Sequence, residues 1–372
     1  MSFSRLLSVA PMMERTDRHF RYFLRLLSKE TLLYTEMITA QAIVKGNKSK
    51  LLNFSKAERP LALQIGGSDP KLLAEATKLG ADWGYDEINL NVGCPSNKVS
   101  SGDFGAILMK RKEQVAKCTD AMINFSGGVP ITIKCRIGVD DQDPNIILPD
   151  FIETVSDTGV STFIIHARKA ILNGLSPKDN RTIPPINYGI VKRMKDKFSQ
   201  LEICINGEIK DLNTVIEFID YGMDGCMIGR EAYKNPSKIL QNADEKIFNK
   251  VENSYMSKNK KLRKALLTMI PYLEKHLLDG GKASSVLRHL INSVYGLEGA
   301  KLFRKTISEN INKINQPEIL EKAINSVNFS DKYWSLVFKR FIDGLNSGIT
   351  PNPCLLYTSD AADEEDSEDL GG

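Results

Sequence analysis

The chain of 372 residues has no long apolar run and no leader-like start. No run of apolar residues approaches the roughly 18 that a membrane-spanning helix needs. The first residues, MSFSRLLSVAPMM, do not divide into a basic region, an apolar region and a small-residue cleavage site, and Leu6–Ala10 fits a first strand better. We therefore expect a soluble protein of the cytoplasm that has no membrane partner.

Metal-binding and disulfide patterns are also missing. The six cysteines are scattered and contain no CxxC pair or other ligand-like spacing, so the sequence predicts neither a metal site nor a disulfide framework. In a reducing compartment most cysteines are small core residues. We expect this of Cys118, Cys135, Cys204 and Cys226, whereas Cys94 follows a predicted strand within NVGCP.

Negative charge is concentrated at the C-terminal end. From Cys354 the chain reads CLLYTSDAADEEDSEDLGG, which looks like translated adaptor sequence from library preparation; a genuine acidic tail is the alternative. This tail holds seven acids and no Lys or Arg, so residues 1–353 carry 50 basic and 39 acidic side chains, a formal charge of +11 compared with +4 for the whole chain. Such an excess fits a polyanionic partner, although surplus lysines also occur on ordinary solvated surfaces.

Short apolar runs of strand length alternate with helix-like segments, which predicts an α/β fold. One of these helices, Pro70–Leu79, has Asp69 as its cap and stops at Gly80, and Asp211–Tyr221 has a similar amphipathic pattern. Eight such strands favour a parallel (β/α)8 TIM barrel. A doubly wound open sheet is the alternative. We favour the barrel because polar residues follow nearly every predicted strand, whereas an open sheet concentrates its site at one switch point. The predicted strands are Leu6–Ala10, Leu32–Thr35, Leu61–Ile65, Glu87–Asn91, Ile131–Cys135, Thr162–His166, Ile203–Asn206 and Gly225–Ile228.

After Arg230 the pattern changes to helical stretches rich in Lys and Leu, without a convincing strand. We expect a barrel domain over residues 1–235, a smaller all-helical domain over 236–348 and a disordered tail over 349–372. The clearest helices of the second domain are Lys261–Leu278 and Lys282–Val294, and His276 and His289 are interpreted as surface or packing residues on them.

Small and polar residues collect where the predicted strands end. In an α/β barrel that rim carries the active site. The glycine turns at Gly207 and Gly229, after the last two strands, can present backbone N–H groups to a phosphate. Gln64, Lys134 and His166 could contact the heteroatoms of a flat ring, and a cation there would stabilise the negative charge of a reduced flavin.

Several of these segments resemble the tRNA-dihydrouridine synthase family. The segment INLNVGCPSNKVSSGDFGA, from Ile88 to Ala106, is similar to that family's signature, and HARKAILNGLSPKDNRTIPPINY, from His166 to Tyr188, resembles its synthase A subfamily. The similarity spans roughly residues 5–345. Further matching segments are LQIGG (63–67), IKCRIG (133–138), NGEI (206–209) and MIGREAY (227–233).

The resemblance implies a flavin enzyme that reduces uridine to 5,6-dihydrouridine at positions 20 and 20a of the tRNA D-loop. NADPH would reduce FMN, reduced FMN would pass a hydride to C6 of the uracil, and Cys94 would protonate C5 from the opposite face. The target base must then leave its stack. Cys94 has to remain a thiol until proton transfer. The loop from Ser96 to Phe104 could close over the substrate.

The resemblance also implies two sets of binding residues. Ordinary solvated charge is the alternative for four of these residues, Arg181, Arg288, Lys301 and Arg304. Lys301 and Arg304 are three apart, so both lie on one helix face. The FMN set is Pro11, Met12, Met13, Gln64, Lys134, His166, Asn206, Gly207, Glu208, Gly229 and Arg230. The tRNA set is Asn91, Arg136, Arg168, Arg181, Arg288, Lys301 and Arg304.

Two other functions remain open from the residues. A free-pyrimidine or dihydroorotate-type FMN oxidoreductase would also pair a flavin barrel with pyrimidine chemistry, but a small substrate needs no basic helical domain. A non-catalytic tRNA-binding protein is the other alternative, and the intact set of Cys94, Lys134 and His166 argues against it. The sequence does not indicate an oligomer or a preference between NADPH and NADH.

Overall fold

The computed structural model describes residues 3–96, 99, 102–250, 257–311, 313 and 315–330. The expected end of the helical domain at residue 348 and the expected tail over 349–372, including the adaptor-like residues from 354, lie outside the described residues.

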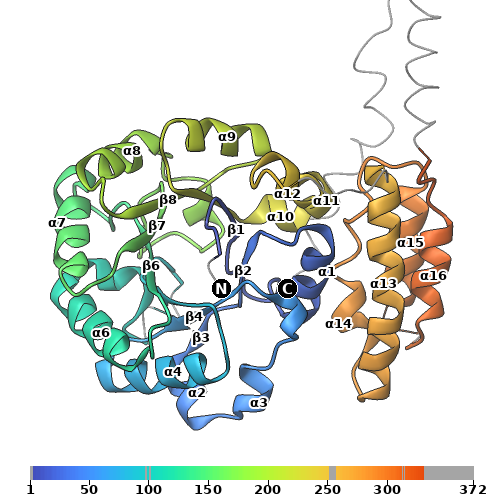
Figure 1. The fold of residues 1–372 in the computed structure, drawn as a ribbon, viewed down its shortest axis with the longest axis horizontal. Helices are drawn as coiled ribbons and strands as arrows, with labels where there is room; N and C mark the ends of the chain where they lie inside the picture. Colours follow the sequence, from blue (N-terminus) through green and yellow to red (C-terminus); the bar gives the residue numbers. More distant parts are fainter. Residues whose placement is uncertain are drawn as a thin grey trace, which may run out of the picture.

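Eight parallel strands form a closed barrel (Figure 1), which confirms the predicted fold class. Each strand pairs with the next one along the chain, the last pairs with β1, and the pairing of β2 with β4 completes the ring, so the open-sheet alternative is wrong. A two-residue strand, β3 (Ile38–Thr39), adds a further pairing to β4. The eight barrel strands are β1 (Leu7–Val9), β2 (Leu32–Tyr34), β4 (Leu61–Gly66), β5 (Glu87–Asn91), β6 (Ile131–Arg136), β7 (Thr162–His166), β8 (Glu202–Asn206) and β9 (Gly225–Ile228).

Helices surround the barrel, and their first residues explain where they begin. In α4 (Pro70–Asp82) the Asp69 side chain accepts a hydrogen bond from the N–H of Leu72, and in α9 (Leu212–Asp220) Asp211 does the same for Thr214. Both predicted helices are present, but the predicted stop of the first at Gly80 is wrong, because α4 continues through this buried glycine to Asp82. The others around the barrel are α1 (Arg18–Leu27), α2 (Ala40–Lys45), α3 (Lys48–Leu51), α6 (Lys112–Phe125), α7 (Pro144–Ser156), α8 (Tyr188–Lys197), α10 (Arg230–Lys234), α11 (Pro236–Leu240) and α12 (Ala243–Lys246), with three 3-10 turns, η1 (Lys56–Glu58), η2 (Gly105–Lys110) and η3 (Asp179–Arg181).

Burial divides the apolar residues into two clusters. The larger cluster packs the outside of the strands against the helices, and four cysteines are buried as predicted. Burial raises the pKa of Cys118, Cys135 and Cys226 to about 12, so these thiols stay protonated and unreactive. The smaller cluster consists of Ala10, Leu32, Tyr34, Ala62, Ile164, Cys204 and Met227.

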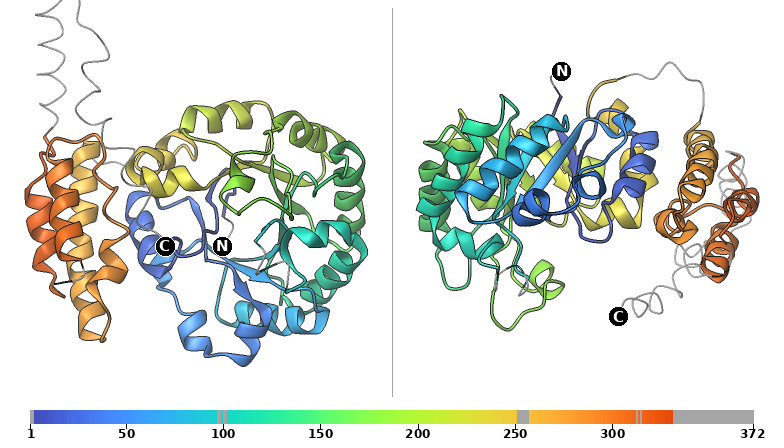
Figure 2. Two further views of the ribbon diagram at one scale, coloured as in Figure 1. Left: turned by 180° about the vertical axis from the view of Figure 1, so that it is seen from behind. Right: turned by 90° about the horizontal axis from the view of Figure 1, so that it is seen from below.

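Among the described residues, four helices follow the barrel domain and stand beside it, next to α1 (Figures 1 and 2). They are α13 (Lys258–Leu278), α14 (Ala283–Leu287), α15 (Ala300–Asn310) and α16 (Glu318–Asn325). In the described part of the chain no strand follows β9, as predicted. We call α13 to α16 the helical domain; the proposed boundary between residues 235 and 236 stays a prediction.

The predicted helix Lys282–Val294 is too long, because α14 ends at Leu287. Beyond it the chain turns, and two serine hydroxyls donate hydrogen bonds to backbone carbonyls of this segment. The Ser293 hydroxyl donates to the carbonyl of Leu290 at 2.7 Å, and the Ser237 hydroxyl donates to the carbonyl of Ser293 at 2.5 Å. Directly after α14 the backbone N–H groups of His289 and Leu290 donate to carbonyls three residues earlier, at 3.2 and 3.0 Å, so the chain continues as tight turns and not as an α-helix.

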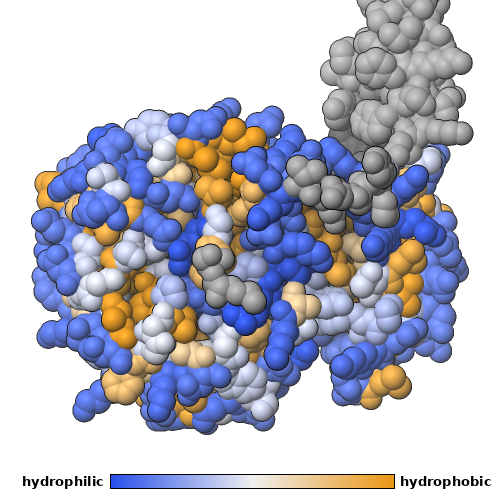
Figure 3. Space-filling view, in the orientation of Figure 1, coloured by the Kyte–Doolittle hydropathy of each residue, from blue (hydrophilic) through white to orange (hydrophobic). Residues whose placement is uncertain are grey.

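Membrane-spanning and metal-binding features were not expected from the sequence. Among the described residues, no helix has both the length and the apolar composition to cross a membrane. Within the same residues, no group of three or more His, Cys, Asp or Glu side chains is arranged to hold a metal ion. The face of the molecule in Figure 3 is mainly hydrophilic, and its hydrophobic patches are small and separate.

Candidate active site at the carboxyl rim of the barrel

Parallel strands bring the predicted rim residues to one end of the barrel. Pro11, Met12 and Met13 follow β1, Cys94 lies three residues beyond β5, and Gly229 follows β9. The remaining rim residues lie among the last three residues of a strand or within two residues after one: Gln64, Asn91, Lys134, Arg136, His166, Arg168, Asn206, Gly207 and Glu208.

Cys94 lies on a turn that is held from both sides. The Asn91 side-chain oxygen accepts hydrogen bonds from the N–H of Gly93 at 3.1 Å and of Cys94 at 3.0 Å. The carbonyl of Cys94 accepts from Ala106 at 2.9 Å. Gly105 packs against this carbonyl with φ +78°, and a Cβ there would lie 2.7 Å from the oxygen. Cys94 is half-buried, unlike the four buried cysteines, so its thiol can meet a substrate at the rim.

Lys134 lies on β6 and His166 on the neighbouring strand β7, where the register sets His166 opposite Arg136. Burial lowers the pKa of both side chains. Burial, followed by the charge of Arg136, lowers the pKa of Lys134 to about 8, and its ammonium donates to Asn206 at 3.1 Å. Burial, with neighbouring cations, also lowers the pKa of His166 well below its usual value. The imidazole is therefore neutral near pH 7, with one donor and one acceptor nitrogen. Its buried Nδ1 has no hydrogen-bond partner among the described residues.

These features fit a flat, anion-bearing heterocycle. A buried nitrogen without a partner costs free energy unless a ligand satisfies it. Gly207 has φ +124°, and a Cβ there would lie 3.6 Å from the Nε2 of His166, so the missing side chain leaves the approach to the imidazole open. The Lys134 ammonium supplies positive charge nearby. A flavin meets each of these demands.

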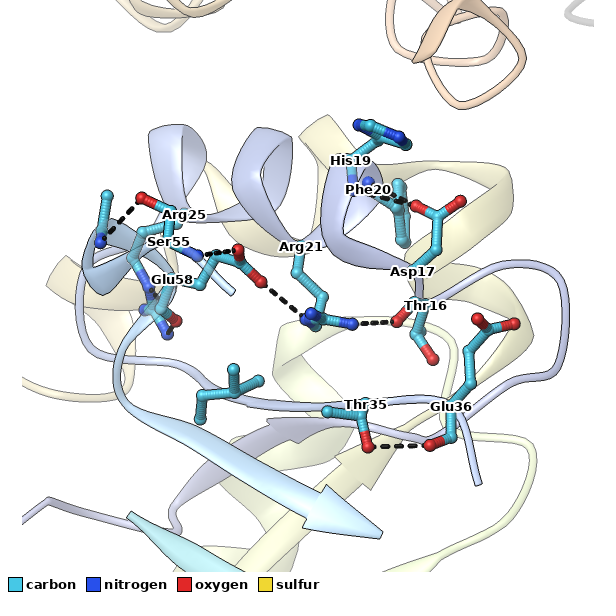
Figure 4. A network of polar contacts seen from close by, with 12 residues as sticks. Thr16, Asp17, His19, Phe20, Arg21, Arg25, Thr35, Glu36, Ser55 and Glu58 are labelled. Atoms are coloured by element: carbon cyan, nitrogen blue, oxygen red, sulfur yellow. Dashed lines mark hydrogen bonds and ion pairs between the residues drawn. The ribbon is translucent and has the colours of Figure 1, made fainter. Parts of the chain in front are cut away.

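The loop after β1 is fixed by a buried ion pair (Figure 4). The N–H of Met12 donates to the Thr16 hydroxyl at 2.9 Å, and the Thr16 carbonyl accepts from Arg21 at 2.7 Å. Arg21 also donates to Glu58 at 2.8 Å, and both side chains are buried. Burial raises the pKa of Glu58, although the Arg21 charge opposes this. These contacts hold the loop that contains the predicted cofactor residues Pro11, Met12 and Met13.

Three predicted tRNA residues are buried: Asn91, Arg136 and Arg168. Arg136 donates to backbone carbonyls of Gly93, Lys169 and Asn180 at 2.9 to 3.0 Å. Arg168 pairs with Glu208 at 2.7 Å and donates to carbonyls of the loop after β7. These guanidinium groups hold rim loops together, so their contact with RNA stays a prediction, as does the assignment of Glu208 to the cofactor.

A group of three arginines lies beside the rim, and sequence reasoning missed one of them. Arg230 donates to the carbonyl of Arg181 at 3.2 Å, and the exposed Arg15 lies 4.7 Å above the ring of Tyr233, three residues after Arg230. Burial and the charges of Arg230 and Arg15 lower the pKa of Arg181. In the described structure none of the three guanidinium groups forms an ion pair with a carboxylate. Arg15 gave no signal because it belongs to no matched segment.

The predicted tRNA residues of the helical domain do not lie together. Arg288 pairs with Asp17 at 2.7 Å, where α1 meets the turn after α14. Lys301 and Arg304 lie on α15, the first exposed and the second half-buried. Arg288 thus belongs to the junction between the barrel and the helical domain, and α15 carries the other two.

Comparison with protein families gives one match over most of the chain. The model described as "Dihydrouridine synthase (Dus)" matches residues 8–328. The chain belongs to the dihydrouridine synthase family. A second model, "tRNA methyl transferase HUP domain", matches only residues 300–360, whose described part consists of α15, α16 and their connecting turns.

Curated members of the dihydrouridine synthase family are similar over nearly their full length. The tRNA-dihydrouridine(20/20a) synthase of Synechocystis sp. is 48% identical over 324 residues, which cover 87% of this chain and 95% of the relative. The synthase of the same name from Vibrio vulnificus is 46% identical over 329 residues, covering 88% and 98%. That of Escherichia coli K12 is 48% identical over 322 residues, covering 86% and 91%.

Solved structures with a similar arrangement are much more distant in sequence. A morphinone reductase in complex with tetrahydroNAD is 12% identical, with a TM-score of 0.47, and covers 67% of this chain and 88% of its own. An old yellow enzyme homologue from Zymomonas mobilis is 11% identical, with a TM-score of 0.48, and covers 67% and 90%.

Proposed function

We propose that this chain is a flavin-dependent oxidoreductase that reduces uridine to 5,6-dihydrouridine in tRNA, at positions 20 and 20a of the D-loop. The single observation that carries the proposal is the half-buried Cys94 on its braced turn, at the rim that also holds Lys134 and His166. Membership of the family, and the names of relatives 46 to 48% identical, supply the substrate.

The cofactor of this proposal is FMN, with NADPH as the reductant. Lys134, His166 and Gln64 would contact the ring. Asn206, Gly207, Glu208, Gly229 and Arg230 would contact the phosphate end, with Pro11, Met12 and Met13 beside the ring. A bound reduced flavin supplies the hydride for the reduction. The glycine turns after β8 and β9 leave room for backbone N–H groups to approach a phosphate, which supports a mononucleotide.

Cys94 is the proposed proton donor to C5 of the uracil. The Asn91 side chain and the N–H of Ala106 hold the turn from opposite ends, so the thiol needs little rearrangement when the base arrives. Residues 97, 98, 100 and 101 of the expected closing loop lie outside the described residues, and its closure stays a prediction.

The tRNA would lie across the rim and the helical domain. Arg15 and Arg181, which lack a carboxylate partner in the described structure, are proposed to bind phosphates beside the pocket, and Arg288, Lys301 and Arg304 further out. Asn91 would lie beneath the base. A formal charge of +11 over residues 1–353 supports a polyanionic substrate.

The deciding experiment supplies purified protein with NADPH and three substrates: unmodified tRNA, free uridine and free uracil. Dihydrouridine formed at positions 20 and 20a of the tRNA, mapped by mass spectrometry, is the expected result. Reduction of the free pyrimidines alone would identify a small-molecule oxidoreductase. Purified protein without yellow flavin absorbance and without activity would support the non-catalytic alternative.

A further inference from the structure

Polar side chains on β5 continue below the Cys94 turn into the barrel interior. Glu87, Asn89 and Asn91 are every second residue of the strand, so they point to the same side. Their exposures are 0%, 0% and 8%. Ile88 and Leu90, which alternate with them, belong to the larger apolar cluster. Burying a polar side chain without a hydrogen bond costs free energy, so each of these three side chains needs a partner inside the barrel.

The lower end of this polar column is an ion pair. The Glu87 carboxylate accepts hydrogen bonds from Arg5 at 2.7 Å, from the Thr132 hydroxyl at 2.7 Å and from the Tyr34 hydroxyl at 2.5 Å. Burial and the Glu87 charge raise the pKa of Tyr34 well above its usual value, so its hydroxyl remains a donor.

The upper end reaches the Cys94 backbone through three amides. Asn89 donates to the Thr132 hydroxyl at 2.8 Å, and Gln64 donates to the side-chain oxygen of Asn89 at 2.8 Å. Asn91 donates to the side-chain oxygen of Gln64 at 2.9 Å. The oxygen of Asn91 then accepts from the N–H of Cys94 at 3.0 Å.

The charge of Glu87 fixes the direction of every hydrogen bond above it. An ionised carboxylate only accepts, and a hydroxyl has one hydrogen, so Thr132 must donate downward and accept from Asn89. Asn89 must then present its oxygen to Gln64, and Gln64 its oxygen to Asn91. The last amide is left with its oxygen toward the turn, which is the orientation that accepts from backbone N–H groups.

We propose that Glu87 is a positioning residue for Cys94, acting through the hydrogen-bonded column of Thr132, Asn89, Gln64 and Asn91. This inference rests on the proposed function, in which Cys94 donates the proton. Reversing the column would turn the NH2 group of Asn91 toward the N–H of Cys94, and two donors cannot bond. The turn would then shift, and the thiol with it.

The test is Glu87→Gln. Glutamine has one NH2 end, which either faces Arg5 or donates to Thr132. In the second case the Thr132 hydroxyl no longer has to donate downward, and the column can reverse. With saturating FMN we expect uridine reduction to slow by about ten- to a hundredfold. Reduction of the flavin by NADPH should slow much less, because Gln64 is the one member of the column that also contacts the ring in the proposed function. In a Cys94→Ala background, Glu87→Gln should cause no further loss, because both changes act at one step.

Glu202→Gln is the matched control. Glu202 also pairs with Arg5, at 2.8 Å, and accepts from Thr162 at 2.6 Å, but it lies outside the column. The control variant should be less stable than the wild type, but it should not slow uridine reduction relative to reduction of the flavin by NADPH. Equal effects of Glu87→Gln and Glu202→Gln, or a full additional loss in the Cys94→Ala background, would overturn the inference.

A second pair of variants covers the case in which Glu87→Gln does not fold. Thr132→Val removes the first link above Glu87. Thr162→Val removes a neighbouring threonine that is paired with Thr132 in register, and both threonines are buried. The alkylation rate of Cys94 by iodoacetamide, followed by mass spectrometry, should change severalfold in Thr132→Val alone. This measurement does not depend on turnover. An unchanged alkylation rate would contradict the role of the column alone, whereas absence of dihydrouridine formation by the wild type would contradict the proposed function alone.

Discussion

The Asp17 carboxylate lies 2.7 Å from Nη2 of Arg288, 271 residues away, and 2.9 Å from Nε2 of His289. The same carboxylate caps α1 by accepting from the N–H groups of His19 and Phe20. One side chain thus starts the first barrel helix and ties it to the helical domain. His289 is buried in this junction, so its interpretation as a packing residue is confirmed, with an ionic partner that the sequence did not reveal.

Asp17→Ala should destabilise the protein by about 2 kcal/mol, because it removes both a helix cap and the partner of a buried histidine. Asp69→Ala removes only a cap, that of α4, and should cost about 1 kcal/mol. Urea unfolding curves for both variants measure the difference. Equal losses would mean that the contact with Arg288 and His289 contributes nothing.

The Asp17 contribution should also depend on pH. Burial alone would raise the pKa of Asp17, but hydrogen bonds from His289, the backbone and Arg288 lower it far below its usual value. A lowered pKa in the folded state stabilises the protein above the unfolded value, about 3.9, and this stabilisation is lost as the pH falls further. The gap in unfolding free energy between wild type and Asp17→Ala should therefore be constant above about pH 5 and shrink below about pH 4.

Cys94→Ala should slow uridine reduction by about a hundredfold or more, the scale of a positioned general acid. Flavin content and reduction of the flavin by NADPH should stay as in the wild type, because neither needs the thiol. Stopped-flow absorbance of the flavin separates the two half-reactions, and Cys118→Ala, at a buried thiol, is the control. Wild-type uridine reduction by Cys94→Ala would remove the thiol from the mechanism.

FMN affinity should weaken as the pH rises through about 8. Lys134 has a pKa of about 8 in the free protein, so it loses its charge above this value and an electron-rich ring loses its cation. Fluorescence quenching titrations should show a nearly constant dissociation constant below about pH 7 and a rise of up to about tenfold per pH unit above 8. Lys134→Met should bind more weakly at low pH and show no such rise. A wild-type affinity that does not change with pH would contradict the role of Lys134.

Arg15→Ala should weaken tRNA binding and reduce its salt dependence by about 0.7–0.9 in log–log slope, as expected for one lost phosphate contact. The double variant Lys301→Ala/Arg304→Ala should reduce the slope about twice as much if both contact RNA. Arg193→Ala, at an exposed arginine that donates to Asn145, is the control and should leave the slope unchanged. An unchanged slope for Arg15→Ala, with FMN and NADPH affinities lowered instead, would assign this arginine to a cofactor phosphate.

The strands and Cys94 could be predicted because their signals are local. Each strand is a short apolar run between turn residues, and NVGCP follows one directly. The polar column could not be predicted, because it depends on the register that sets Gln64 opposite Asn89 and Asn89 opposite Thr132. The early end of α14 could not be predicted either, because the turns that follow it contact the barrel domain, where the Ser237 hydroxyl donates to the carbonyl of Ser293. The role of Arg15 could not be predicted, because its neighbours Tyr233 and Arg181 lie far along the chain.

The junction at Asp17 has an evolutionary consequence. A change of Asp17 to an apolar residue would leave His289 buried without its acid, and a change of His289 would leave Asp17 without its partner. Single replacements on either side are therefore disfavoured, whereas paired replacements restore the balance. Among related sequences, positions 17, 288 and 289 should vary together, and a barrel taken from one relative should accept the helical domain of another only when these three positions come from the same parent.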